Sequence, residues 1–292
     1  MIVLLFAILA TAAPAPLEAL YTRARRYDKD AFRFVPPTEE RQRAVEALAV
    51  AITAAPAAPD PPKRLRQRAA AVGLELLAAR DSAGTVWVLR EPDGTRAGAG
   101  LYAFRPGGAP LCVQAPHSFF DTGTGALALD LFARMKAACL AVNTVHRYTA
   151  AAAGGGTPAD VAHAPATLFG AVTRAIVSGP RWTIVQLHGF AQRDDVPAQA
   201  AAVVADGSAR PPADSAAGRL RRALADHLHA RVLLYGDDVQ VLGATTNVQA
   251  RAAQAAGVGF LHVEMSEATR RGLAGSGTAP LADALREALP IR

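Results

Sequence analysis

The sequence predicts an α/β fold, in which a mostly parallel or mixed central sheet is flanked by helices and preceded by a helical N-terminal extension. Two observations support this prediction. From residue 73 onward, short apolar runs alternate with longer segments of helical periodicity, as in strand–helix–strand units. Residues 17–55, in contrast, carry helical periodicity alone. At 292 residues, the chain is long enough to bury a large core.

The first residues, MIVLLFAILATAAPAP, combine an apolar run with small residues in the spacing of a signal-peptide cleavage site. The run is shorter than the roughly 20 residues that a membrane-spanning helix needs. We therefore expect residues 1–13 to be a signal peptide. The mature protein is then expected to be periplasmic or secreted, with no stable membrane insertion after signal cleavage. The alternative is a buried N-terminal helix.

Residues 14–72 are expected to form the helical extension. The segment TEERQRAVEALAVAIT opens with Thr38, a good helix N-cap, and has an acidic pair in its first turn. Residues 54–62, AAPAAPDPP, form a stiff, proline-rich break. A second short helix is expected over residues 63–72.

Residues 73–292 are expected to form the main α/β domain. It opens with the strand LELLAAR and a hairpin whose turn contains Asp93 and Gly94. Further strands are expected over residues 110–116, 140–145, 182–188, 231–235 and 258–265. Helices are expected over residues 125–139, 159–177, 215–230, 246–256 and 279–288. The low-complexity segments 150–160 and 191–215 are expected to be loops, and loops of this length are usually functional or disordered.

The chain is basic, with a formal net charge of +6. Nucleic acid is nevertheless not an expected partner. The basic clusters at residues 23–26, 63–68 and 219–222 are short, and no aromatic residues interleave them as a stacking platform would need. A cationic surface also attracts small anionic molecules, and a small anionic amide or peptide is the partner that we expect.

The two cysteines, Cys112 and Cys139, fall at the beginnings of neighbouring predicted strands. In an exported protein they could form one disulfide, or they could remain two buried free thiols, because sequence spacing cannot establish the approach that a disulfide requires. Neither is expected to be catalytic. Cys112 lies within an apolar strand, whereas a nucleophilic cysteine needs a partly exposed, electropositive setting.

Four titratable side chains lie at or near the ends of predicted strands, namely His117, His146, His188 and Glu264. Each has an ordinary structural explanation by itself, such as a hydrogen-bonded histidine or a buried, paired carboxylate. The carboxyl ends of parallel strands, however, form the ligand-binding edge of an open α/β sheet. The coincidence of these residues at one edge therefore favours a functional site.

His117, Asp121 and His188 together offer the ligands of a catalytic zinc site, which combines imidazole and carboxylate donors with an open position. Such a metal polarises a carbonyl and activates water, while a separate carboxylate carries the proton, and Glu264 suits that role. The alternative for Asp121 is a turn or helix-capping residue in the segment DTGTG.

Three segments, APHSFFDTGT, IVQLHGF and FLHVEMSEATRR, resemble the signatures of the zinc carboxypeptidase and amidohydrolase superfamily. This superfamily includes the metallocarboxypeptidases, the N-formylglutamate amidohydrolases and the poly-γ-glutamate hydrolases. The resemblance covers residues 73–275 and implies a phosphorylase/hydrolase-like fold of the zinc-peptidase type. It implies that His117, Asp121 and His188 hold Zn2+ and that Glu264 is the general base. The spacing differs in one place, because carboxypeptidases separate the first histidine from a glutamate by two residues and this chain has three before Asp121.

The resemblance extends to substrate binding. Carboxypeptidases hold the substrate with an adjacent Asn–Arg pair, and the nearest equivalents in this chain are Asn143 and Arg147, which are separated. We expect both to bind substrate, and Arg147 to hold a carboxylate, because a guanidinium can bind it with two hydrogen bonds.

Asp160 and His163 follow a glycine-rich loop at the expected start of helix 159–177. We expect this segment to close over the site, so that His163 contributes to substrate binding. The alternative is that Asp160 is only a helix N-cap. His262 shares a face of its strand with Glu264. It is therefore a candidate to orient the residues that bind the metal or substrate without binding either itself.

The sequence thus predicts an exported zinc-dependent hydrolase that cleaves an amide bond in a small acyl-amino acid or peptide-like anionic substrate. One alternative is a non-catalytic periplasmic binding module that retains the pocket at the sheet edge. Another is a metal-independent hydrolase that uses Ser118 beside His117, although no acid and base are placed for it.

Overall fold

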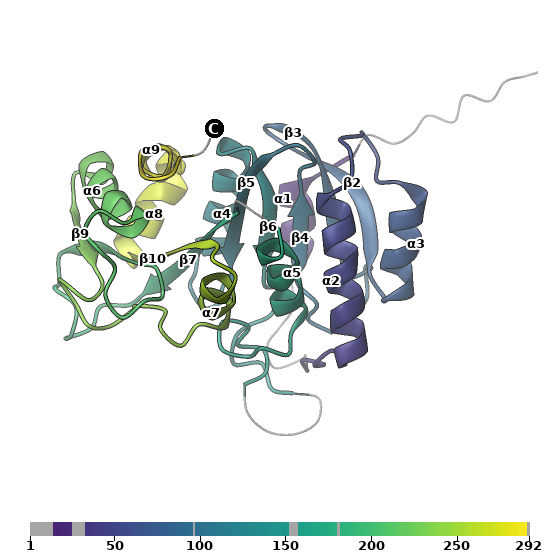
Figure 1. The fold of residues 1–292 in the computed structure, drawn as a ribbon, viewed down its shortest axis with the longest axis horizontal. Helices are drawn as coiled ribbons and strands as arrows, with labels where there is room; N and C mark the ends of the chain where they lie inside the picture. The colour runs from purple at the N-terminus through teal and green to yellow at the C-terminus, as the bar shows by residue number, and fades with distance from the viewer. Residues whose placement is uncertain (1–13, 25–32, 96, 152–156, 180–181, 291–292) are drawn as a thin grey trace, which may run out of the picture.

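The structure is a computed structural model that describes residues 14–24, 33–95, 97–151, 157–179 and 182–290. Figure 1 shows one central sheet with helices on both of its faces. The expected signal peptide, residues 1–13, lies outside the described residues. Among the described residues, every helix falls short of the length and apolarity that a membrane span needs.

The strands of the described residues form one mixed sheet in the order β1-β2-β3-β4-β6-β5-β7-β10-β8-β9. Their bounds are β1 Ala15–Pro16, β2 Glu75–Asp81, β3 Gly84–Arg90, β4 Leu101–Phe104, β5 Ala109–Ala115, β6 Ala137–Val142, β7 Thr183–Phe190, β8 Ala200–Ala205, β9 Arg231–Leu234 and β10 Gly259–Ser266. The central strands β6, β5, β7 and β10 run parallel, whereas β2, β3 and β4 pair antiparallel. The predicted α/β fold with a mostly parallel or mixed sheet is confirmed.

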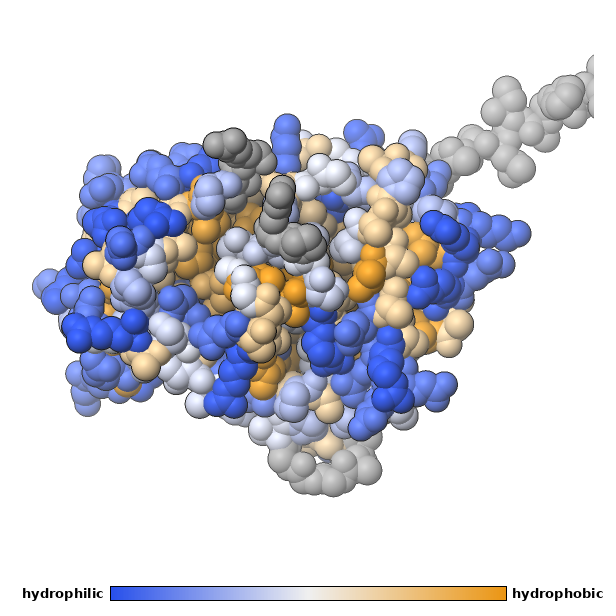
Figure 2. Space-filling model, viewed as in Figure 1, coloured by the Kyte–Doolittle hydropathy of each residue, from blue (hydrophilic) through white to orange (hydrophobic). Residues whose placement is uncertain are grey.

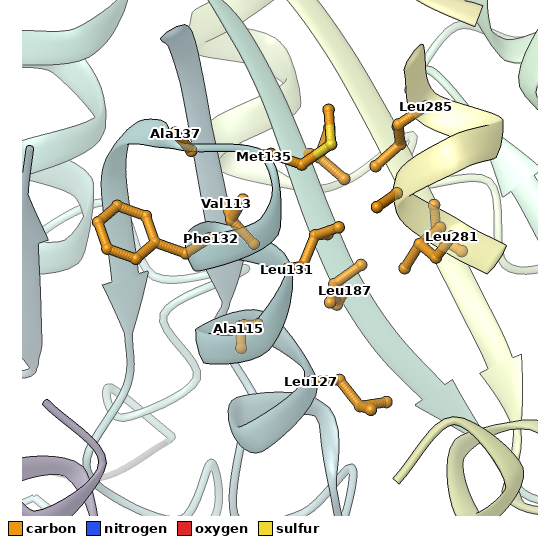
Figure 3. Packing of buried hydrophobic residues seen from close by; sticks show 14 of the residues in the cluster. Val113, Ala115, Leu127, Leu131, Phe132, Met135, Ala137, Leu187, Leu281 and Leu285 are labelled. Carbon is orange, nitrogen blue, oxygen red and sulfur yellow. The ribbon is translucent and has the colours of Figure 1, made fainter. Parts of the chain in front are cut away.

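Helices cover both faces of this sheet. Their bounds are α1 Leu17–Ala24, α2 Glu39–Thr53, α3 Lys63–Ala71, α4 Thr124–Arg134, α5 Leu168–Val177, α6 Ala216–Leu228, α7 Val248–Ala255, α8 Glu267–Ser276 and α9 Ala279–Ala288. Buried side chains of α1, α4, α6, α8 and α9 share one core, and those of α2, α3, α5 and α7 share another. Figure 3 shows part of the first core, to which Leu131 of α4, Leu187 of β7 and Leu281 of α9 all belong. On the face seen in Figure 2, hydrophilic side chains are interspersed with apolar areas.

The residues of the expected N-terminal extension pack onto the sheet. β1 pairs with β2, and Leu17 of α1 joins the first core. Val45 of α2 lies in the second core with Trp87, whose indole N–H donates to the Ala58 carbonyl at 3.1 Å. Thr38 caps α2 as expected, because its side chain accepts a backbone N–H of the first turn. The division into an extension and a main domain stays a prediction.

The helix expected over residues 159–177 begins only at Leu168, which corrects the prediction. Pro165 disfavours helical backbone at the residue before it and cannot donate a backbone hydrogen bond. Residues 157–167 contain turns and bends but no helix, so Asp160 is not part of one. Thr167 is the N-cap, since its side chain accepts a backbone N–H from the first turn of α5.

Three further elements differ from the prediction, namely β8, α4 and α8. The segment 191–215, expected to be a loop, contains β8, whose residues AAAVVA are all buried and pair antiparallel with β10. Alanine is depleted in strands, so this run carried little strand signal. The helix expected over 125–139 ends at Arg134, because Lys136 adopts a left-handed backbone (φ 46°) and the chain then enters β6. Helix α8 was not expected, since its glycines weaken the helical pattern.

Cys112 on β5 and Cys139 on β6 are register neighbours in the parallel pair. Both are buried free thiols, with their Sγ atoms 2.8 Å apart. Burial is the main cause that raises the pKa of Cys139 well above its ordinary value. A protonated, buried thiol is a poor nucleophile, so this pair offers no catalytic group.

Candidate metal and active site

The site residues expected from the sequence meet at one edge of the sheet. Strands β5, β7 and β10 are parallel neighbours, so their carboxyl ends lie together. The register places His188 of β7 beside Glu264 of β10, and His117 follows the end of β5. A pocket of about 600 Å³ opens here, lined among others by His117, Asp121, Arg147, His163, His188, His262 and Glu264. Among the expected site residues, Asn143 and His146 do not line this pocket.

A tight turn after β5 carries Asp121 back toward His117. The backbone N–H groups of Phe120 and Asp121 both donate to the His117 carbonyl, at 2.9 and 2.8 Å. Gly123 follows with φ +95°, a left-handed conformation that suits glycine, and it leads the chain into α4. Positions four apart lie on the same side of a helical turn. The spacing of HSFFD therefore lets one loop present two donor side chains.

Ser118 and Asn143 are buried beside this loop and do not line the pocket. The Ser118 hydroxyl donates to the Asn143 carbonyl at 2.6 Å. The Asn143 amide donates to the carbonyls of Pro116 and Ala159, at 2.9 and 3.3 Å, and its oxygen accepts the Val145 N–H at 3.3 Å. These bonds hold the loops after β5 and β6 together. They leave Asn143 no polar group directed to a substrate and give Ser118 no access to one.

Three donor atoms converge inside the pocket. Asp121 Oδ2 lies 3.5 Å from His117 Nδ1 and 3.2 Å from His188 Nδ1. All three atoms lie within 4.8 Å of one another, and all three side chains are buried. Within the described residues, Asp121 Oδ2 has no hydrogen-bond partner. A buried carboxylate oxygen without a hydrogen bond calls for a positive neighbour.

In both imidazoles the second ring nitrogen, Nε2, lies beside a hydrogen-bond acceptor. His117 Nε2 lies 2.8 Å from Asp160 Oδ1, and His188 Nε2 lies 2.9 Å from Gln186 Oε1. A neutral imidazole that donates from Nε2 to such an acceptor keeps a lone pair on Nδ1, the atom that a metal ion would bind. Two such nitrogens and one carboxylate oxygen match the donor set of a zinc site with an open position. The residues present fit a divalent cation.

Burial and neighbouring groups set the charge states of these ligands. Burial lowers the pKa of His188 to about 4, and the neighbouring His262 acts in the same direction, so the imidazole is neutral at pH 7. Burial raises the pKa of Asp121, but the two nearby imidazoles outweigh it and hold the pKa well below its ordinary value. Burial lowers the pKa of His117, but Asp121 and Asp160 outweigh it and raise the pKa.

Glu264 supplies a second carboxylate beside the donor atoms. Its Oε1 lies 3.2 Å from His262 Nε2, and in the part of the chain that the structure describes its Oε2 has no hydrogen-bond partner. Burial raises the pKa of Glu264, but the hydrogen bond to His262 and the nearby His188 outweigh it and lower the pKa. A carboxylate that is ionised and only half satisfied can accept a proton from water in the pocket.

Asp160 is the centre of a charged cluster next to His117. Its Oδ2 accepts from Arg147 Nη2 at 2.5 Å and lies 3.1 Å from His163 Nδ1. The alternative that Asp160 is a helix N-cap is wrong, because α5 begins only at Leu168. Its carboxylate instead contacts His117 Nε2, the ring nitrogen that is not among the three converging donor atoms. Carboxylates commonly contact metal-ligating histidines in this way.

Arg147 forms part of the pocket wall. Its guanidinium carbon lies 5.5 Å from the centroid of the Phe120 ring and 5.4 Å from that of Tyr148, within cation–π range. Its Nη1 lies 3.3 Å from His117 Nδ1. The side chain is 20% exposed, so it can reach a ligand in the pocket. His163 is 45% exposed at the same pocket.

The sequence reasoning missed a second cation in the pocket lining. Arg193 follows β7 and forms an ion pair with Asp195. Its hydrogen bond to Asp195 is the main cause that raises the pKa of Arg193, and the charge of Glu264 adds to it. The residue falls in the low-complexity segment 191–215, where no periodicity marks a position. Its basic side chain was the only signal available.

Arg270 is a second missed residue, and it fastens the site segments together. Its Nε donates to the Thr122 carbonyl at 2.9 Å, after β5. Its Nη1 donates to the Phe190 carbonyl on β7 at 3.5 Å, and to the Met265 carbonyl on β10. A Cβ atom at Gly189 would lie 2.1 Å from Arg270 Nη1, so a glycine is needed there. All three segments with the family resemblance thus meet at one buried guanidinium.

No family model matches the chain, and no curated protein matches it. Solved structures do match it. N-formylglutamate amidohydrolase from Ralstonia eutropha is 15% identical over 62% of this chain and 93% of that chain, with a TM-score of 0.39. A putative carboxypeptidase A from Shewanella denitrificans is 10% identical over 74% and 76%, with a TM-score of 0.44. A metallo-carboxypeptidase from Burkholderia cenocepacia is 14% identical over 87% and 68%, with a TM-score of 0.39.

Proposed function

We propose that this protein is an exported zinc-dependent hydrolase that cleaves an amide bond in a small acyl-amino acid or peptide-like anionic substrate. One observation carries the proposal. Two buried imidazoles, those of His117 and His188, face a carboxylate oxygen of Asp121 that has no hydrogen-bond partner among the described residues, beside the ionised carboxylate of Glu264. Export rests on the apolar run and cleavage-site spacing that precede residue 14.

His117, Asp121 and His188 would hold the metal. Three protein ligands leave an open position for a reactant, which distinguishes a catalytic zinc site from a structural one. When bound, zinc acts as a Lewis acid that polarises the scissile carbonyl and makes water easier to deprotonate. The neutral His188 and the ionised Asp121 are in the protonation states that ligands require.

Glu264 would move the proton. Its free oxygen accepts a proton from the attacking water while the water oxygen bonds to the carbonyl carbon. The carbon–nitrogen bond then breaks, and Glu264 returns the proton to the leaving nitrogen, so that a carboxylic acid and an amine are released. His262 holds the other oxygen and so fixes the direction in which the carboxylate works.

Two arginines in the pocket lining support an anionic substrate. Arg147 is held by Asp160, also contacts His117, and lines the pocket with a side chain that is 20% exposed. Arg193 is 42% exposed in the same lining. A substrate carboxylate bound by a guanidinium fixes the position of the adjacent amide. Phe120 and Phe190 contribute apolar surface that excludes water around the reacting group.

Turnover by the Glu264→Gln variant tests this proposal. The zinc-loaded protein is assayed on acyl-amino acids and short peptides, and loss of the proton carrier is expected to lower kcat about 10²- to 10⁴-fold. Glu267→Gln is the matched control, because Glu267 is exposed and pairs only with Arg271 of the same helix. Equal turnover by Glu264→Gln and wild type would overturn the role of Glu264. Substrate binding without turnover in the wild-type protein would favour the non-catalytic binding module.

A further inference from the structure

A chain of buried side-chain amides lies next to His188. Gln186 is two residues before His188 on β7, and the strand register places Gln114 of β5 and His262 of β10 on either side of it. Asn247, at the start of α7, reaches Gln186 from the helix layer. The side-chain amides in this chain are almost fully buried. Buried amides need partners for both their oxygen and their nitrogen, so the direction of each bond constrains the next.

The start of α7 fixes the direction of the hydrogen bonds at one end of this chain of amides. Asn247 Oδ1 accepts the backbone N–H groups of Gln249 and Ala250, at 2.9 and 3.0 Å. A backbone N–H can only donate, so the Asn247 oxygen is committed to the helix and its NH2 group points the other way. That NH2 group donates to Gln186 Oε1 at 2.6 Å.

The other end of the chain of amides imposes the same direction on the hydrogen bonds. Gln186 Nε2 donates to Gln114 Oε1 at 3.0 Å, and Gln114 Nε2 donates to Thr173 Oγ1 at 3.1 Å. The Thr173 hydroxyl then donates to the Phe169 carbonyl at 3.0 Å. A backbone carbonyl can only accept. Backbone donors lie at one end of the chain of amides and a backbone acceptor lies at the other. The hydrogen bonds between the amides can therefore run in one direction only.

This direction decides which nitrogen of His188 carries the hydrogen. The Gln186 oxygen that accepts from Asn247 also lies 2.9 Å from His188 Nε2. His188 Nε2 must therefore donate, which leaves Nδ1 with a lone pair 3.2 Å from Asp121 Oδ2.

We propose that Asn247 is a positioning residue that sets the tautomer of His188 through Gln186 and keeps His188 Nδ1 available as a ligand. The proposal rests on the proposed function only in giving Nδ1 a metal to bind. The tautomer itself is a property of the metal-free protein.

The Asn247→Asp variant tests the direction of the chain. An aspartate keeps the oxygen that caps α7 but cannot donate to Gln186 while it is ionised. Gln186 is then expected to turn its NH2 group toward the aspartate. Gln114 turns with it, and the Thr173 hydroxyl donates to the Gln114 oxygen in place of the Phe169 carbonyl. His188 Nε2 thereby becomes an acceptor, and its hydrogen moves to Nδ1. The measurement is the ring-nitrogen chemical shift pattern of nitrogen-labelled histidine in the metal-free full chain. His188 is expected to be the Nε2–H tautomer in wild type and the Nδ1–H tautomer in the variant.

Gln186→Glu is the matched control, because it adds the same charge to the same chain of amides. A glutamate still presents an acceptor to His188 and Asn247, so the Nε2–H tautomer is expected to persist. Titration with zinc gives a second measurement on the same proteins. Asn247→Asp is expected to weaken zinc binding about 10- to 100-fold, as the loss of a partner behind a metal ligand does.

Two results would overturn the proposal: an Nδ1–H tautomer in wild type, or an Nε2–H tautomer with unchanged zinc affinity in Asn247→Asp. If that variant does not fold, Asn247→Ser keeps a capping oxygen and lacks the amide donor. A mixture of His188 tautomers is expected there, and a pure Nε2–H signal would overturn the proposal. A wild-type protein that has the Nε2–H tautomer but binds no zinc would contradict the proposed function alone.

Discussion

Two buried carboxylates in different parts of the sheet show what separates a structural charge from one that is available for chemistry. Glu91, just after β3, is 6% exposed, and Glu264, on β10, is 8% exposed. Both oxygens of Glu91 accept backbone N–H groups, from Ala97 at 2.9 Å and Gly98 at 3.2 Å. One oxygen of Glu264 has no hydrogen-bond partner among the described residues, and the Glu264 side chain lines the pocket.

Burial alone therefore does not distinguish the two roles. The pKa of Glu91 is raised, because burial outweighs its backbone hydrogen bonds. Burial also raises the pKa of Glu264, but His262 and His188 outweigh it, so the pKa is lowered. An ionised carboxylate with an unused oxygen, held beside imidazoles in a pocket, is the pattern of a functional group. Asp121 follows the same pattern.

The Gly189→Ala substitution would disturb the hydrogen bonds by which Arg270 links the site segments. It is expected to have the largest effect on the free energy of unfolding among these variants. The new methyl group collides with the Arg270 guanidinium, which cannot move without losing its bonds to backbone carbonyls. Overpacking of this kind costs about 1–3 kcal/mol, and turnover is expected to fall with it. Urea unfolding and kcat measure the two effects.

Gly272→Ala is the control for this substitution. Gly272 lies in α8, and nothing lies within 4 Å of a Cβ placed there. Alanine in an open helix position is expected to stabilise the protein by about 0.5–1 kcal/mol. Gly189→Ala with the same stability and turnover as Gly272→Ala would show that Arg270 does not hold the site segments.

Glu91→Gln tests most directly whether Glu91 has a structural role and Glu264 a functional one. A glutamine can accept only one of the two backbone N–H groups, so the other loses its partner at a cost of about 1–3 kcal/mol. Turnover is expected to stay near the wild-type value, because Glu91 does not line the pocket of Glu264. Chemical denaturation and the amide-hydrolysis assay are run on the same preparation. A large loss of kcat with unchanged stability would contradict the distinction.

Asp130 extends the comparison to a satisfied carboxylate nearer the surface. Its Oδ2 accepts from the N–H and hydroxyl of Thr278 and from Arg134, each at 2.8 Å. Burial raises the pKa of Asp130, but these bonds outweigh it and hold the pKa below 3.8. A lowered folded-state pKa stabilises the fold above the unfolded-state pKa near 4 and loses this contribution as pH falls through the folded-state value.

The effect of Asp130→Asn is expected to be the smallest. The Asp130 side chain is 36% exposed, so solvent screening limits the loss at pH 7 to less than about 1 kcal/mol. The difference between variant and wild type is expected to shrink at acid pH, where the aspartate is protonated. Urea unfolding as a function of pH measures it. A difference that is independent of pH would show that the charge of Asp130 does not contribute.

Much of the site could be predicted because strand ends are visible in the sequence. His117, His188 and Glu264 each follow or end a short apolar run, and parallel strands bring such positions to one edge. The return of Asp121 to His117 followed from a separation of four positions. These features depend on local patterns, which a single sequence carries.

The remaining features depend on contacts between distant segments. Asp160 was expected on a helix, and only the turns before α5 show that its carboxylate contacts His117. Arg270 and Asn247 act through hydrogen bonds to segments far away in the chain, and neither side chain has a distinctive spacing. Strand β8 was missed because its alanines have low strand propensity and are buried only by the tertiary fold.

Zinc binding tests the central claim most directly, which is that His117, Asp121 and His188 together hold a metal. Metal-free full-length protein is titrated with zinc by calorimetry, beside Asp121→Asn, which keeps the shape of the side chain but removes its charge. We expect a single zinc ion per wild-type chain and a weakening in the variant that exceeds the roughly 10- to 100-fold cost of losing an outer partner. No zinc uptake by wild type, or equal affinities of the two proteins, would contradict the claim.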